Sequence, residues 1–289
     1  MSRLVSRIDQ TLSEATQRLT DSHTARKEQS DTARLDAEVL LCHVLGKPYS
    51  YLFTWPEREL TPEQAEQFES MLAQRILGTP VAYITGEKEF WSLKLNVSPS
   101  VLIPRPDTER LVELALSMPV SDQATVADLG TGSGAIALAM AIERPHWQVI
   151  GVDRLSGPVA IAKENAALNQ IGNVTFVEGD WCSPLSDPLD MIVSNPPYIR
   201  EDDEHLAQGD VQFEPRSALT AGKDGLDDIR TISRQAFGKL KPGGWLLFEH
   251  GYDQGRDIRI ILESNGFTAI STQQDLSGQD RVTLAQKTA

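Results

Sequence analysis

The sequence predicts a doubly wound α/β domain that follows a smaller helical domain. From Thr125 onward, short apolar runs alternate with helix-like stretches. These runs are apolar throughout rather than at every second residue, which suits parallel strands covered on both faces. The first run leads into a glycine-rich segment that opens a helix, as in other doubly wound domains. A chain of 289 residues has room for both domains.

Residues 1–85 are expected to form the helical domain. Apolar residues across Leu35–Leu45 recur with helical spacing. Thr61-Pro62 then predicts another helix start, with Thr61 as N-cap and proline at the first helical position, and this helix runs to about Leu77. These residues carry no visible chemistry, so we expect the domain to recognise a substrate.

Residues 86–105 are expected to form a β-hairpin linker, because apolar positions there partly alternate. The linker ends in prolines that fix the backbone, and Asp107 or Thr108 is expected to cap the helix Arg110–Ser117.

Residues 106–289 are expected to form the α/β domain. The predicted strands are Val126–Leu129, Val149–Asp153, Val174–Glu178, Met191–Ser194, Trp245–Glu249, Thr268–Gln273 and Val282–Ala285. The predicted helices among them are Ala135–Ile142, Pro158–Asn169, Gly225–Leu240 and Gln254–Ser264.

Charge and composition disfavour several classes of protein. The formal net charge is −14, and arginines are interleaved with carboxylates. Proteins that grip a phosphate backbone usually present a basic face, so direct nucleic-acid binding is not expected. No window reaches the roughly 18 apolar residues of a membrane span, so no membrane association is expected.

The N-terminus and the cysteines indicate a cytoplasmic protein. Met1–Arg7 lacks the apolar core of a secretory signal. Cys42 and Cys182 are far apart, and the histidines show no metal-ligand spacing. We therefore expect a reduced cytoplasmic protein without a metal site.

The segment Asp128-Leu129-Gly130-Thr131-Gly132-Ser133-Gly134 lies where a predicted strand meets a helix. Glycines there let the backbone turn tightly and approach a ligand. Taken alone, the segment fits S-adenosylmethionine, a dinucleotide or a merely structural turn.

Acidic and aromatic residues follow the next two strands. Asp153 ends the second strand, where a carboxylate can accept both hydroxyls of a ribose, although it can also cap the following helix. After the third strand, Asp180 can accept from an adenine amino group and Trp181 can cover the ring. The alternative for this pair is a surface turn with a half-buried tryptophan.

Asn195-Pro196-Pro197-Tyr198 follows the fourth strand and favours methyl transfer to a planar nitrogen. Asn195 and the Pro196 carbonyl can accept both hydrogens of an NH2 group, and Tyr198 can stack on the plane that bears it. An amide nitrogen is a poor nucleophile, because its lone pair is delocalised into the carbonyl. Two acceptors orient it and stabilise the developing charge without a strong base. A dehydrogenase has no need of this arrangement.

Two other polar groups are noted. The acidic run Glu201–Glu204 predicts a solvated loop rather than an acceptor-recognition segment. No role is assigned to Glu249 or His250, which end the fifth strand.

Several motifs together resemble those of the peptide chain release factor N5-glutamine methyltransferases. They cover nearly the whole chain, and the combination of P-R-P-D-T-E with N-P-P-Y is specific. The motifs are Thr85–Trp91, Val101–Glu109, Asp128–Gly134, Asn195–Tyr198 and Phe213–Leu219.

The resemblance implies a Rossmann-like class I methyltransferase domain with a seven-stranded, mostly parallel sheet, behind an N-terminal helical domain and a hairpin. It implies S-adenosyl-L-methionine as cofactor, and release factors as protein substrates, methylated at the glutamine of their Gly-Gly-Gln motif. The glycine-rich loop, Asp153, the Asp180-Trp181 pair and Asn195 would hold the cofactor, while Asn195–Tyr198 would also hold the glutamine amide. The Gly157-Pro158 step departs from the family and leaves the start of its helix open.

Three alternatives use the same residues. Enzymes that methylate a glutamine of a ribosomal protein share N-P-P-Y but lack the P-R-P-D-T-E form of the linker. A nucleic-acid amino methyltransferase would apply the same clamp to a flipped base, which the acidic balance disfavours. A non-catalytic binding module is disfavoured because both the clamp and the cofactor loop are intact.

Overall fold

The computed structural model describes residues 7–26, 32–186 and 188–288. It divides into two compact units. The first comprises the described residues through Gly86 together with Glu204–Phe213, and the second comprises Glu87–Asp203 and the described residues from Glu214 onward. The hairpin expected as a linker therefore groups with the second unit. The N-terminal residues Met1–Ser6, part of the segment considered for a secretory signal, lie outside the described residues.

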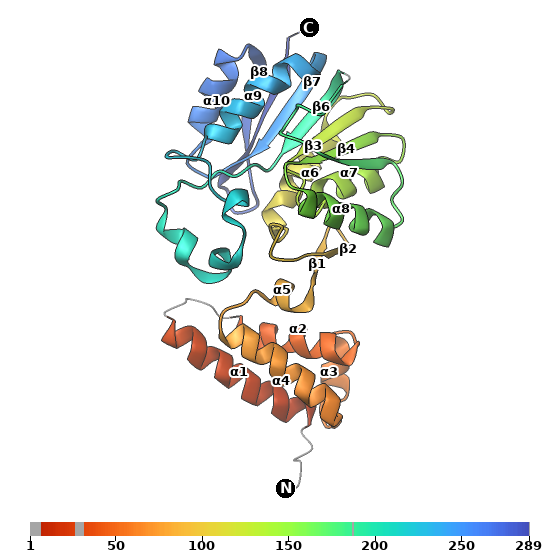
Figure 1. Cartoon of the computed structure of the whole chain (residues 1–289), viewed down its shortest axis with the longest axis vertical. Coiled ribbons are helices and arrows are strands. Elements are labelled where there is room, and N and C mark those ends of the chain that lie inside the picture. The colour runs from red at the N-terminus through yellow and green to blue at the C-terminus, as the bar shows by residue number, and fades with distance from the viewer. Residues whose placement is uncertain (1–6, 27–31, 187, 289) are drawn as a thin grey trace. The chain divides into compact units, whose positions relative to one another are not determined.

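The first unit is built from packed helices (Figure 1). Apolar side chains of α1, α2 and α4 form its core, including Leu19, Leu40 and Leu72. The predicted start of α4 is confirmed, because Thr61 Oγ1 accepts from Gln64 N at 3.2 Å and Gln64 Oε1 accepts from Thr61 N at 3.0 Å. The helices are α1 (Ile8–Ala25), α2 (Ala33–Leu45), α3 (Ser50–Thr54), α4 (Pro62–Ile76) and α5 (Val81–Thr85).

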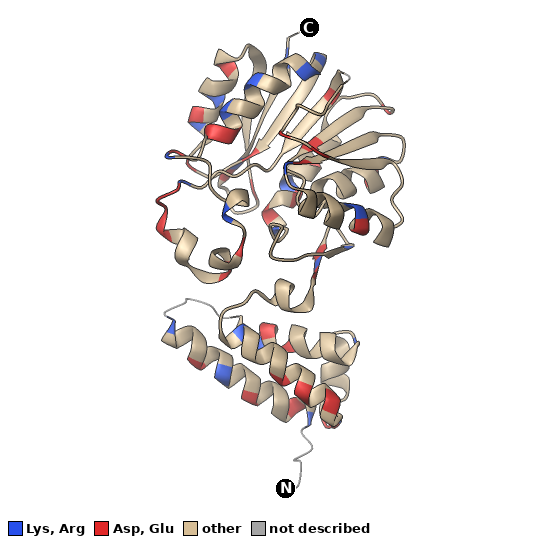
Figure 2. Cartoon of the chain, viewed as in Figure 1, with Lys and Arg blue, Asp and Glu red and all other residues tan. Residues whose placement is uncertain are grey.

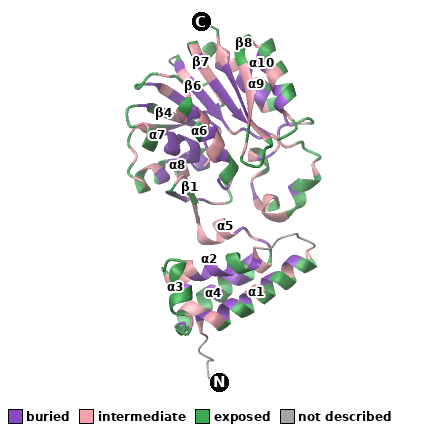
Figure 3. Cartoon of the chain, turned by 180° about the vertical axis from the view of Figure 1, so that it is seen from behind, coloured by how far each residue is buried: buried purple, intermediate pink, exposed green. Residues whose placement is uncertain are grey.

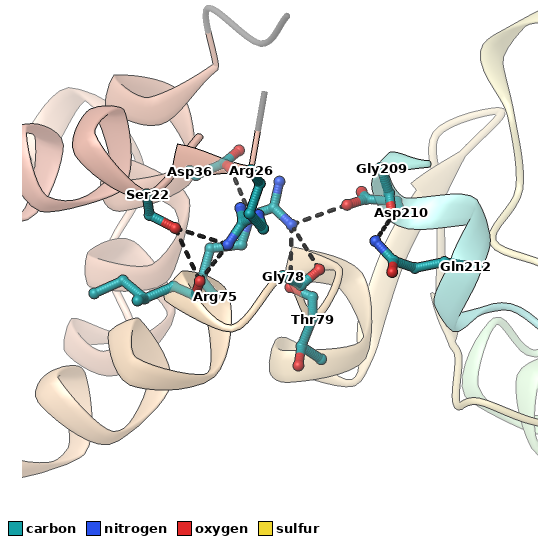
Figure 4. Close-up of polar contacts among 10 residues, drawn as sticks. Ser22, Arg26, Asp36, Arg75, Gly78, Thr79, Gly209, Asp210 and Gln212 are labelled. Carbon is teal, nitrogen blue, oxygen red and sulfur yellow. Dashed lines mark hydrogen bonds and ion pairs between the residues drawn. The ribbon is translucent and has the colours of Figure 1, made fainter. Parts of the chain in front are cut away.

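The segment Glu204–Phe213 completes the first unit, although it follows Asn195–Tyr198 in the chain. It forms two short 3₁₀ helices, η2 (Glu204–Ala207) and η3 (Gly209–Phe213). The buried Arg75 donates to Asp36 Oδ2 at 2.7 Å and to Asp210 Oδ1 at 2.9 Å (Figure 4). The same guanidinium donates to the carbonyls of Gly78 and Thr79, so one side chain joins α4, α2 and η3.

The second unit contains a seven-stranded sheet in the order β5-β4-β3-β6-β7-β9-β8. Pairing is parallel from β5 to β7, whereas β9 runs antiparallel to both β7 and β8. This confirms the predicted fold class. The strands are β3 (Thr125–Leu129), β4 (Gln148–Asp153), β5 (Val174–Glu178), β6 (Leu189–Ser194), β7 (Leu240–Glu249), β8 (Phe267–Gln274) and β9 (Asp280–Lys287).

Helices cover both faces of this sheet, which explains why its central strands are apolar throughout and buried (Figure 3). One core packs against helices α6, α7 and α8, with Leu111, Ile136 and Ala162 among its members. The other packs against α9 and α10, with Ile232 and Leu262. These helices are α6 (Glu109–Ser117), α7 (Ala135–Glu143), α8 (Ser156–Leu168), α9 (Asp227–Lys239) and α10 (Gly255–Ser264).

The chain enters this sheet through the predicted hairpin, β1 (Glu87–Phe90) and β2 (Leu93–Asn96), which pair antiparallel. After it, Pro106–Thr108 forms the 3₁₀ helix η1 and α6 begins at Glu109. The expected side-chain cap of α6 is wrong: among the described residues Thr108 makes no capping bond. Its hydroxyl instead accepts from Asn195 Nδ2 at 3.2 Å.

The Gly157-Pro158 step is accommodated inside α8, which begins at Ser156.

Over the described residues, no helix has the length and apolar character needed to cross a bilayer.

Candidate active site

A cavity opens beside the glycine-rich loop of the second unit, where β3, β4 and β6 end. It encloses about 760 Å³, counting the part open to solvent. Its wall brings together residues that the sequence separates widely, including Gly130, Asp153, Trp181 and Asn195. Crevices at the carboxyl ends of parallel strands are the usual ligand sites of such sheets.

The glycine-rich loop forms one wall of this cavity. Gly130 has φ +72°, a conformation that favours glycine, and a Cβ atom there would lie 3.3 Å from the ring of Trp181, a tight contact. Behind the loop, the buried Asp128 accepts from Thr131 Oγ1 at 2.6 Å and from Ala137 N at 3.2 Å. Burial raises the pKa of Asp128 to about 7, while these two hydrogen bonds lower it. Asp128 therefore shapes the loop from inside.

Asp153 faces the cavity from the end of β4. Its Oδ2 accepts from Gly132 N at 3.0 Å and its Oδ1 accepts from Leu155 N at 3.1 Å. Burial raises the pKa of this carboxyl, while the two backbone hydrogen bonds lower it. Each oxygen has a further lone pair, so the carboxylate has acceptor capacity left for two ligand hydroxyls. The helix-cap role considered for Asp153 is wrong, because α8 begins at Ser156 with Leu155 as its N-cap and without a side-chain capping bond, whereas the proposed ligand role does not depend on a cap.

Asp180 and Trp181 line the cavity directly after β5. Ser183 Oγ accepts from the backbone N–H of Asp180 at 3.1 Å and fixes the turn. Trp181 has φ 48°, an uncommon backbone conformation for a bulky residue, which brings its ring against Gly130. The ring thus supplies an apolar surface next to the polar loop.

Asn195-Pro196-Pro197-Tyr198 begins directly after β6, and both prolines are buried. Asn195 and Pro197 line the cavity. The carbonyl of Tyr198 accepts from Gln254 Nε2 at 2.9 Å. Burial, and then the charge of Glu249, raises the pKa of the Tyr198 hydroxyl to about 12, so the ring is neutral at physiological pH.

The residues expected from sequence therefore divide into two groups. Those that line the cavity are Gly130, Gly132, Asp153, Asp180, Trp181, Asn195 and Pro197. Those outside its lining are Asp128, Thr131, Ser133, Gly134, Pro196 and Tyr198. No cluster of three or more potential metal ligands occurs among the described residues.

Comparisons with known proteins identify the family. Residues 10–86 match the family model described as PrmC N-terminal domain, and residues 108–214 match the one described as Methyltransferase small domain. The release factor glutamine methyltransferase of Vibrio cholerae is 57% identical over 259 residues, covering 89% of this chain and 91% of that protein. The protein of the same name from Pseudomonas aeruginosa is 54% identical over 258 residues, covering 89% and 94%. The chain belongs to the release factor glutamine methyltransferase family.

A solved structure shows the same fold at lower sequence identity. The catalytic domain of hMettl16, solved in complex with an RNA hairpin of the MAT2A 3'UTR, superposes with a TM-score of 0.58. The match has 17% identity and covers 76% of this chain and 82% of that one. At this identity the likeness concerns the methyltransferase fold alone.

Two residues that contact predicted motifs, Glu214 and Gly225, were not predicted from the sequence. Glu214 Oε2 lies 2.6 Å from Arg105 Nη2, so the linker motif is tied to the Phe213–Leu219 motif. Gly225 has φ +73°, and a Cβ there would lie 2.2 Å from the carbonyl oxygen of Tyr198. For Glu214 the signal was present, because the linker motif and the Phe213–Leu219 motif were both noted without a chemical role, whereas Gly225 was expected only as the start of a helix.

Proposed function

We propose that this protein transfers a methyl group from S-adenosyl-L-methionine to the side-chain amide nitrogen (N5) of a glutamine in peptide chain release factors, within their Gly-Gly-Gln motif. One observation carries the proposal: Asn195 and Pro197 line the same cavity as the glycine-rich loop, Asp153 and Trp181. A group held by the first pair therefore lies in the same cavity as a ligand held by the others. The family membership supports the acceptor.

The hydrogen-bond acceptors and the aromatic ring that line the cavity suit the cofactor. When bound, S-adenosylmethionine supplies a methyl group on a positively charged sulfur, which keeps the bonding electron pair as the methyl leaves. Asp153 has the acceptor capacity for ribose hydroxyls, and the Trp181 ring offers an apolar surface for the adenine. Asp180, at the same wall, can accept from the adenine amino group.

The chain's part in catalysis is to orient a weak nucleophile. Asn195 Oδ1 and the Pro196 carbonyl accept the two hydrogens of the glutamine amide, and Tyr198 stacks on its plane. Held in this way, the nitrogen directs its lone pair toward the methyl group, and positive charge developing on it is stabilised by both acceptors. The nitrogen then releases one proton to water, and no strong base is needed beforehand.

The charge distribution supports a protein acceptor rather than a nucleic acid. The chain has 41 Asp and Glu against 27 Lys and Arg, and acidic and basic residues are interspersed in both units (Figure 2). We expect the enzyme to work where translation takes place, in the cytoplasm.

The deciding experiment measures transfer of radiolabelled methyl from S-adenosylmethionine to three acceptors in parallel. These are purified release factors, ribosomal proteins and RNA. We expect label on release factors, and its loss when the glutamine of their Gly-Gly-Gln motif is changed to alanine. Label on ribosomal protein alone, or on RNA alone, would replace the proposed acceptor.

A further inference from the structure

Three polar side chains from three elements meet behind the cavity. Thr108 lies in η1, Asn195 follows β6, and Glu249 ends β7. Asn195 Nδ2 donates to Thr108 Oγ1 at 3.2 Å, and hydrogen bonding by the side chains of Thr108 and Asn195 lowers the pKa of Glu249. Thr108 is 4% exposed and Glu249 is 2% exposed, so water does not substitute for these contacts.

The chemistry of the three groups fixes the direction of each bond. An ionised carboxylate only accepts, so Thr108 donates its hydroxyl hydrogen to Glu249. The Thr108 oxygen then has lone pairs to accept from Asn195 Nδ2. The Glu249 carboxylate and the Thr108 oxygen both accept hydrogen bonds, so Asn195 turns its side-chain nitrogen toward them. This orientation leaves Asn195 Oδ1 for a ligand in the cavity that Asn195 lines.

We infer that Thr108 and Glu249 are positioning residues that lock the Asn195 amide with Oδ1, rather than Nδ2, presented to the acceptor nitrogen. This deepens the proposed function and rests on it. If Asn195 turned over, its own N–H groups would face the N–H groups of the glutamine amide, and the two donors would repel each other. The fixed orientation of Asn195 therefore favours a methyl-accepting group whose nitrogen donates hydrogen bonds, such as an NH2 group.

Folding alone gives no reason for this arrangement. Thr108 stands at the N-cap of α6, yet among the described residues it makes no side-chain capping bond, although threonine is a favourable cap. Glu249 Oε2 is buried without a hydrogen-bond partner among the residues that the structure describes. A buried carboxylate with an unsatisfied oxygen destabilises a fold, so a methyl-bearing or amide side chain would serve packing better.

Charged and titratable groups around Glu249 come from several elements. Arg281 on β9 favours the ionised carboxylate, whereas Asp107 in η1 opposes it. Tyr198 also interacts with Glu249 by charge. Burial is the largest influence and raises the pKa of Glu249 to about 7, with the Thr108 hydrogen bond acting in the opposite direction. The lock therefore responds to pH near neutrality.

The kinetic test compares Thr108→Val, Thr108→Ser and the control Thr268→Val, an exposed threonine of β8. We expect Thr108→Val to lower kcat roughly tenfold, less than the ~10²–10³ that follows loss of a directly stabilising group. Calorimetry should show that its Kd for S-adenosylmethionine changes less than about twofold, which is less than the loss of one hydrogen bond to the cofactor would cause. Thr108→Ser should restore kcat. Equal losses in the valine and serine variants would overturn the inference.

A double-mutant cycle tests whether Thr108 acts through Asn195. In an Asn195→Ala background, Thr108→Val should have no further effect on kcat. The same fractional loss in both backgrounds would contradict a positioning role. If Asn195→Ala by itself leaves turnover unchanged, the proposed function of the clamp fails instead, and the two failures are distinguished.

A readout independent of turnover follows the Asn195 side chain directly. In ¹⁵N-labelled protein, its NH2 resonance is identified by its loss in Asn195→Ala. We expect this resonance to shift as pH crosses about 7 and to move in Thr108→Val, but not in Thr268→Val. A resonance insensitive to both changes would show that Nδ2 is not held by Thr108 and Glu249.

Discussion

The guanidinium of Arg75 bridges two carboxylates that are far apart in sequence, Asp36 at 2.7 Å and Asp210 at 2.9 Å. Burial opposes the charge of Arg75, but the two carboxylates outweigh burial and raise its pKa. Asp210 lies in the segment that leaves Tyr198 and returns at Glu214.

Arg75→Met should destabilise the helical unit by roughly 3 kcal/mol, because it leaves the mostly buried Asp36 without its partner. Asp210→Asn should cost under about 1 kcal/mol, since that side chain is 41% exposed. Denaturant unfolding followed by circular dichroism measures both. The matched control is Arg18→Met, which breaks an exposed pair with Glu69. If Arg75→Met were no less stable than this control, the bridge would contribute nothing to folding.

Asn195→Ala should lower methyl transfer to release factors by roughly 10²–10³-fold, because one of the two acceptors for the amide hydrogens is lost. Calorimetry should show little change in the Kd for S-adenosylmethionine, because the cofactor depends mainly on the loop, Asp153 and Trp181. Turnover equal to that of the unaltered protein would exclude the clamp. A parallel loss of cofactor affinity would instead assign Asn195 to the cofactor.

Asp153→Ala should act in the opposite way and weaken cofactor binding. The change removes the acceptor of the Gly132 N–H at 3.0 Å as well as the proposed ribose contacts. Hydrogen bonds to a charged group contribute about 1.5–3 kcal/mol, so we expect the Kd to rise roughly ten- to a hundredfold. Asp122→Ala, in the exposed loop before β3, is the control. An unchanged Kd would mean that the carboxylate only caps the loop.

The sheet and much of the site wall could be predicted because their signals are local. An apolar run, such as that of β3, predicts its own strand, and the parallel order then brings Asp153 and Asn195 to one edge. The partners of Thr108 could not be predicted in this way. As a helix N-cap it has a local role, and only the fold shows that Asn195 competes for its hydroxyl.

The placement of residues 204–213 was also beyond the sequence reasoning. The acidic run Glu201–Glu204 predicted a solvated loop, and its residues are exposed or half-buried, but nothing in it indicated that Asp210, farther along the chain, pairs with Arg75 on α4. Ion pairs between distant segments leave no periodic pattern, so the charge alone did not indicate a partner. The family resemblance includes the adjacent motif Phe213–Leu219, but the sequence alone does not show that Glu214 of this motif pairs with Arg105.

Glu249→Gln should stabilise the protein increasingly as pH rises. The folded pKa of Glu249 is raised from 4.5 to about 7, so between these values the native state binds more protons than the unfolded state. Native stability contributed by the protonated form is therefore full below about pH 4.5 and is lost as pH rises through 7. By pH 8 the unaltered protein has lost roughly 3 kcal/mol of its free energy of unfolding to the ionisation of Glu249, and the neutral glutamine avoids this loss.

The same substitution should change the pH profile of turnover. In the unaltered protein, kcat should rise as pH increases through about 7, because the ionised Glu249 holds Thr108 and Asn195 in the active orientation. Glu249→Gln should remove that inflection, whereas Glu164→Gln, at an exposed position of α8, should keep both the inflection and the original stability profile. Asp128 also has a pKa of about 7, so an inflection retained in Glu249→Gln would assign the titration to Asp128 instead. Stability and turnover thus oppose each other at Glu249, since ionisation costs folding free energy and sets the orientation that the reaction uses.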